Sequence, residues 1–183
     1  MDTNTTILFA VLALFVVGAL LAPLFIRRQR SKGFSNQFGP EYDRTVESLG
    51  SNTKAQKEMA ERQKHVDTLD IRLLSTAERD RYLAEWTAVQ AEFVNQPGQA
   101  TVEADRLIME VMQLRNYPLS DFDERAADIS VSYPPELVSN YRAAREIAIK
   151  NQNHEADTEE LRQAMIYYRS LFGQLLEVEL VTA

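Results

Sequence analysis

The sequence Ile7-Leu-Phe-Ala-Val-Leu-Ala-Leu-Phe-Val-Val-Gly-Ala-Leu-Leu-Ala-Pro-Leu-Phe-Ile26 determines where the rest of the chain lies, because it contains no charged or strongly polar side chain. Fourteen of its twenty residues are Leu, Ile, Val or Phe. An α-helix of this length spans about 30 Å, which matches the hydrocarbon core of a bilayer. The run therefore predicts a transmembrane helix over residues 7–26, with the lipid bilayer as its partner.

Four basic residues follow this run and set its orientation: Arg27, Arg28, Arg30 and Lys32. A cleaved signal peptide carries its positive charge before the apolar stretch. Here the charged side chain that precedes the run is the acidic Asp2. Lys and Arg beside a span are retained on the cytoplasmic side. We therefore expect a retained single-pass anchor in the cell inner membrane, with the N-terminus outside and residues 33–183 in the cytoplasm.

The part of the chain beyond Lys32 is acidic, with a formal charge of about −10 against −7 for the whole chain. Nucleic-acid affinity comes mainly from Lys and Arg on phosphates, so an acidic domain without a basic stripe is not expected to bind nucleic acid. The sequence contains no cysteine, which excludes disulfides, thiolate chemistry and cysteine-ligated zinc or iron–sulfur clusters.

Apolar residues recur at helical spacing along the rest of the chain, and no segment alternates as a strand does. Capping boxes at Ser75–Glu78 and Asp157–Glu160 begin two of the helices, and Asn95–Gly98 interrupts the pattern. We predict an all-α protein in three parts. Residues 1–32 form a transmembrane anchor with a basic cytoplasmic flank, 33–39 a polar tether, and 40–183 an acidic cytoplasmic bundle of about six amphipathic helices.

Several segments in this order resemble an uncharacterised bacterial family of small proteins with an N-terminal hydrophobic segment. They include Phe38-Gly-Pro-Glu-Tyr-Asp-Arg-Thr-Val46 and Glu160-Leu-Arg-Gln-Ala-Met165. The resemblance covers residues 38–176 and implies one intact domain. Since that family has no established activity, it implies no catalytic residue.

No catalytic, cofactor-binding or metal site is predicted. His65 lies four residues after Glu61, which favours a surface pair, and His154 lies in a polar loop without a second histidine at ligand spacing. One acidic group allows two interpretations, a cation site or a solvated helix start, and its members are Asp121, Asp123, Glu124 and Asp128. The spacing of an EF-hand loop is missing, and acidic residues in a first helical turn compensate the helix dipole, so we favour the helix start.

The segment Gly39–Leu49 is a short amphipathic helix close to the predicted anchor. Two arrangements are open: it packs on its own domain, or it docks on a neighbouring membrane protein. Its candidate partner-binding residues are Tyr42, Arg44 and Val46.

Two functions remain. The favoured one is an accessory or scaffolding subunit that binds other membrane proteins, in a larger assembly, from the cytoplasmic face; a respiratory or photosynthetic complex is a conceivable host. The alternative is a membrane-tethered enzyme or small-ligand sensor whose site lies between helices. The absence of any assembled catalytic motif favours the non-enzymatic role.

Overall fold

The computed structural model describes residues 33–118 and 121–177, and these residues form helices and no β-strand. The all-α prediction is confirmed for this part of the chain, which holds seven labelled helices and the helical residues 33–38 where about six helices were expected. They are α2 (Pro40–Leu49), α3 (Asn52–Thr68), α4 (Thr76–Phe93), α5 (Pro97–Leu114), α6 (Phe122–Ser132), α7 (Pro135–Gln152) and α8 (Thr158–Leu176).

The predicted anchor over residues 7–26 and its basic flank lie outside the described residues. Among the helices that are described, none is both long and apolar enough to cross a membrane.

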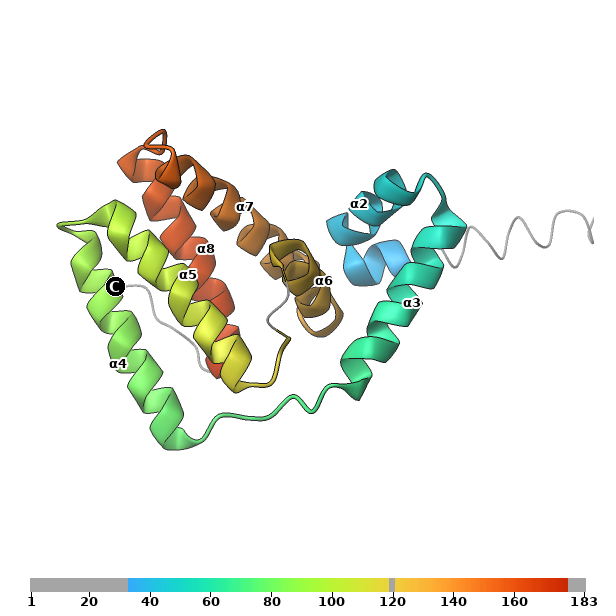
Figure 1. Cartoon of the computed structure of the whole chain (residues 1–183), viewed down its shortest axis with the longest axis horizontal. Helices are drawn as coiled ribbons and strands as arrows, with labels where there is room; N and C mark the ends of the chain where they lie inside the picture. Colours follow the sequence, from blue (N-terminus) through green and yellow to red (C-terminus); the bar gives the residue numbers. More distant parts are fainter. Residues whose placement is uncertain (1–32, 119–120, 178–183) are drawn as a thin grey trace, which may run out of the picture.

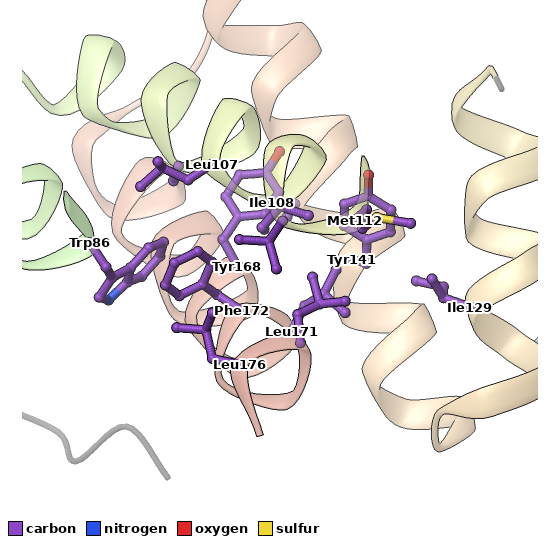
Figure 2. Close-up of a cluster of buried hydrophobic side chains, with 14 of the residues drawn as sticks. Trp86, Leu107, Ile108, Met112, Ile129, Tyr141, Tyr168, Leu171, Phe172 and Leu176 are labelled. Carbon is purple, nitrogen blue, oxygen red and sulfur yellow. The ribbon is translucent and has the colours of Figure 1, made fainter. Parts of the chain in front are cut away.

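The larger of two hydrophobic cores lies among α4, α5, α7 and α8, with α8 packed against both α5 and α7 (Figure 1). Aromatic side chains fill its centre. The rings of Trp86 and Phe172 stack at 4.7 Å between α4 and α8, and Tyr141 and Tyr168 meet edge to face at 6.4 Å (Figure 2). All four side chains belong to the apolar stripes that the helical spacing marks, so burial of these stripes drives the assembly.

A smaller core holds α2 and α3 together as a helical hairpin. It consists of Phe38, Tyr42, Ala55 and Met59, against which Phe34 and Val46 pack. Residues 33–38, expected as part of a polar tether, are helical, and the Phe38 side chain is only 1% exposed. The physical reason is the i, i+4 spacing of Phe34 and Phe38, which places both rings on one face of this segment, and the Phe34 ring also stacks on Tyr42 of α2 at 6.2 Å.

Figure 1 shows α6 between the hairpin and the larger helical group, and the two parts meet through α3 on α6 and α2 on α7. An extended linker then joins α3 to α4. The Arg115 side chain fastens this linker by donating from Nε to the Arg72 carbonyl at 3.2 Å, and Asn116 donates to the Asp70 carbonyl at 2.8 Å. The hairpin is therefore held by the contacts of α2 and α3 with α7 and α6, and by the fastened linker that follows α3.

Local capping chemistry begins several of the helices. Both predicted capping boxes, Ser75 with Glu78 and Asp157 with Glu160, are confirmed. The predicted break at Asn95–Gly98 is shorter than expected, because α5 already begins at Pro97. Proline is favoured in the first turn of a helix, where its missing N–H costs nothing.

Candidate functional site

An open groove of about 680 Å³ separates the α2–α3 hairpin from α6 and α7, and we call it the hairpin groove. Its lining is dominated by charged side chains: seven carboxylates face three arginines and one histidine. The lining residues are Glu41, Arg44, Thr45, Ser48, Glu58, Glu61, Arg62, His65, Asp121, Asp123, Glu124, Ala127, Asp128 and Arg142.

Arg142 of α7 is the best-satisfied charge in this groove. Its Nε and Nη2 atoms donate to the two carboxylate oxygens of Glu41 at 2.8 and 2.7 Å, and its Nη1 donates to Asp123 at 2.6 Å. Burial lowers the pKa of Arg142, but the hydrogen bonds to Glu41 and Asp123 outweigh burial and raise it. The guanidinium therefore serves the fold and leaves no positive charge for a ligand.

Asp128 of α6 is the least satisfied charge. The residue is 3% exposed and lines the groove, and no hydrogen bond or ion pair joins its carboxylate to another described residue. Burial raises the pKa of this carboxyl, while the nearby charges of His65 and Arg62 on α3 lower it in part. Burial removes much of the water around this carboxylate, which opens on the groove, so a cation that enters the groove would stabilise its charged form.

The remaining charges divide into internal pairs and unpaired groups. Arg62 contacts Glu58 at 3.3 Å, and Glu61 contacts Lys57 at 3.5 Å. Glu124 and Arg44 are exposed and have no ion-pair partner within the described ranges. After internal pairing, the groove keeps an excess of negative charge.

The candidate partner-binding residues of α2 lie in different environments. Tyr42 is buried in the hairpin core, where its hydroxyl donates to Asn52 Oδ1 at 3.3 Å. Val46 is half-buried against the same core, whereas Arg44 is exposed and lines the groove. The structure thus brings one of the three, Arg44, to the candidate site. The predicted topology residues Arg27, Arg28, Arg30 and Lys32 lie outside the described residues.

The acidic group of α6 is only partly a solvated helix start. Asp121 caps the helix by accepting from the Glu124 backbone N–H at 2.9 Å, as a helix start requires. Asp123 binds Arg142 instead, and Asp128 is buried, so the prediction that this residue is solvated is wrong. The reason is that α3 packs on α6 and covers it.

Within residues 33–118 and 121–177, no group of three acidic or histidine side chains is placed to hold a metal ion. His65 lines the groove, while Glu61, its expected partner, contacts Lys57. His154 adopts a left-handed conformation, with φ of 60°, in the turn after α7.

A second polar cluster, centred on Asp105, lies inside the larger core and was not predicted from the sequence. The Asp105 side chain is near Tyr168, and its Oδ2 lies 3.9 Å from Arg145 Nη1. Burial raises the pKa of Asp105, and burial together with the Asp105 charge raises the pKa of Tyr168. The signal in the sequence was position: Asp105 lies three residues before Ile108 on the buried stripe of α5.

Comparison with known proteins finds no relative of this chain. The resemblance to a bacterial family of small proteins accordingly stays a prediction. No protein-family model, curated protein or solved structure matches the chain.

Proposed function

We propose that the protein is a single-pass membrane-anchored accessory subunit that binds a larger membrane protein assembly from its cytoplasmic face. Two features of the sequence support the anchor and its orientation: the uncharged run over residues 7–26 and the basic residues that follow it. The helical domain supplies a binding surface in place of catalytic machinery.

The observation that carries the proposal is the packing of residues 33–38 into the hairpin core. Phe34 and Phe38 stack at 6.0 Å, and Phe38 is buried, so this segment is part of the domain. Six residues, 27–32, lie between it and the apolar run, and they can span at most about 20 Å. The hairpin and its groove are thereby kept close to the bilayer surface, where neighbouring membrane proteins present their loops.

The experiment is purification of the full-length chain from its native membranes in mild detergent. We expect one membrane protein or complex to co-purify in fixed stoichiometry. A matched control carries Leu14→Asp and Val17→Asp, because charges at the centre of a span cost about 2.5–3.5 kcal/mol each and should release the chain from the membrane. Recovery of the wild-type chain only as a free monomer would contradict the proposal.

Orientation has its own test. A reporter that is active only in the cytoplasm, fused after Ala183, should be active, and a reporter active only in the periplasm should be silent. The reverse pattern would place the domain outside and remove the proposed cytoplasmic partners.

The alternative, a membrane-tethered enzyme or small-ligand sensor, is supported by the volume of the hairpin groove, since small-molecule sites range from about 300 to 1,000 Å³. Such sites are lined mainly by apolar and aromatic side chains. The lining here consists mostly of carboxylates and arginines, which suits a charged polypeptide segment better.

A further inference from the structure

We infer that the hairpin groove is the docking site for a cationic segment of the membrane partner, a loop rich in Lys or Arg, with Asp128 as the carboxylate that receives one of its cations. The inference rests on the proposed function and adds the site and the chemistry of the contact.

Charge complementarity is the first step. The groove presents seven carboxylates, and the Arg142 guanidinium in its lining is already bound by Glu41 and Asp123. Arg44, which also lines the groove, has no such carboxylate partner among the described residues. It is exposed, so water and salt screen its repulsion of an incoming cation. A positively charged segment therefore gains electrostatic energy on entry.

Asp128 supplies the second and independent step, because the residue is 3% exposed, lines the groove, and has a carboxylate that no described residue pairs with. A Lys ammonium or Arg guanidinium would provide that donor, and charge-assisted hydrogen bonds are about twice as strong as neutral ones. Exposed acidic residues elsewhere on the chain offer no such gain, since water already satisfies them. Because Asp128 requires a cationic partner, the groove has one specific binding position in addition to its overall negative charge.

The location of the groove selects the source of the cation. Cytoplasmic loops of membrane proteins carry an excess of Lys and Arg close to their spans. The hairpin begins directly after residues 33–38 and is held near the bilayer by the short segment 27–32. Anionic lipid head groups and nucleic acids carry the charge of the groove itself and are repelled by it. A basic polypeptide loop is the occupant that is both positively charged and located close to the bilayer.

A binding assay with a defined probe tests the site. The full-length chain in nanodiscs of zwitterionic phosphatidylcholine is titrated with a fluorescein-labelled peptide of alternating Arg and Ala, and binding is followed by anisotropy. We expect Asp128→Asn to weaken binding about tenfold, the loss of one charge-assisted hydrogen bond. The matched control is Asp80→Asn, which removes the same charge from an exposed position on α4 outside the groove, and it should change binding less than about twofold.

A second pair keeps the test informative if Asp128→Asn does not fold. Glu124 is exposed and lines the groove, while Glu155 is exposed and lies in the turn after α7. Glu124→Gln should weaken peptide binding more than Glu155→Gln. Equal effects within both pairs would show that only net charge attracts the peptide, and that result would overturn the inference.

The native partner separates this inference from the proposed function. A photo-cross-linker at Ser48, which is exposed on the groove, should capture the partner that co-purifies, and one at Val94, which is 83% exposed on the α4–α5 turn, should not. Capture from Val94 but not Ser48 would overturn the docking site while leaving the accessory role intact. Absence of any co-purifying partner would instead contradict the proposed function, whatever the peptide shows.

Discussion

The Arg142 guanidinium binds both carboxylate oxygens of Glu41, at 2.7 and 2.8 Å, across 101 residues of sequence. Both side chains are almost completely buried, with 10% and 7% of their areas exposed. The pair joins α7 of the larger helical group to α2 of the hairpin and forms one wall of the groove. It therefore fixes the position of the hairpin relative to the rest of the domain.

Glu41→Gln should destabilise the domain by about 3 kcal/mol, because it leaves the buried Arg142 charge without its main partner. The remaining carboxylate, Asp123, is 85% exposed and replaces little of the loss. Urea unfolding of the full-length chain in detergent, followed by fluorescence of its single tryptophan, Trp86, measures the change.

The control for this change is Glu85→Gln on α4, where the pair with Arg81 is exposed and its atoms lie 3.6 Å apart. Surface pairs contribute about 0–1 kcal/mol, so the control should shift stability by less than about 0.5 kcal/mol. Equal losses for Glu41→Gln and Glu85→Gln would contradict the structural role of the buried pair.

Arg115→Lys should destabilise the domain by about 2–3 kcal/mol although the charge is kept. The Arg115 fork donates to the carbonyls of Arg72 and Leu175, to the Tyr133 hydroxyl and to Glu177, at 2.8 to 3.2 Å. A lysine ammonium lacks this planar fork and leaves buried acceptors unsatisfied. Thermal unfolding by circular dichroism measures the loss.

Arg106→Lys, on the exposed face of α5, is the matched control for Arg115→Lys at the C-cap of that helix. Its partners Glu103 and Glu110 are neighbours along α5, so the effect should stay below about 0.5 kcal/mol. A comparable loss at both positions would mean that the hydrogen bonds of Arg115 add nothing to the fold.

The sequence predicted the helices well because their signals are local. Ser75 with Glu78 and Asp157 with Glu160 announce helix starts within four residues, and the stripe from Leu161 to Leu176 marks the buried face of α8. The division into two cores was beyond such patterns, because spacing tells which face is buried but not which element covers it. Phe34 and Phe38 carried a usable signal, their i, i+4 spacing, within a segment that otherwise reads as polar.

The groove depended on contacts that no local pattern contains. Glu41 and Arg142 are separated by most of the domain, and only the packing of α2 on α7 brings them together. Asp128 shares its sequence neighbourhood with the capping residue Asp121, so composition alone suggested the same solvated role. Its burial follows from the packing of α3 on α6, a tertiary contact that the local sequence does not reveal.

Asp105→Asn should change the pH dependence of stability. Burial, partly offset by Arg145 and Tyr168, raises the pKa of Asp105 in the folded protein above its value in the unfolded chain. The folded state then binds more protons between these two pKa values, so the contribution of Asp105 to stability falls as pH rises through them. Asn cannot ionise, and the variant should gain stability relative to wild type as pH rises from about 4 towards about 7.

Urea unfolding of both proteins at several pH values in this range checks the Asp105 prediction. Glu103→Gln, a change on the same helix at a partly exposed position, is the control and should give a pH profile close to that of wild type. Parallel profiles for wild type and Asp105→Asn would show that the folded and unfolded pKa values of Asp105 are equal.

Gly39→Ala should destabilise the contact between the hairpin and α7 by about 2–4 kcal/mol. Gly39 has a φ of 51°, and a Cβ at this position would lie 2.6 Å from the Pro135 Cβ, part of a rigid ring at the start of α7. The substitution combines a φ, ψ pair of 51° and −131°, which residues with a Cβ rarely adopt, with a steric overlap that the ring cannot relieve by rotation. Gly50→Ala is the milder comparison, because Gly50 has φ 63° and ψ 18°, a left-handed conformation that other residues adopt at moderate cost, and no atom lies within 4 Å of its added Cβ. That variant should lose only about 1–2 kcal/mol, the cost of the strain alone.

Since α2 forms one wall of the groove, Gly39→Ala should also weaken binding of the Arg-Ala peptide, whereas Gly50→Ala should leave it unchanged. Equal losses of stability in the two variants would contradict both the close contact with Pro135 and the higher backbone cost at Gly39.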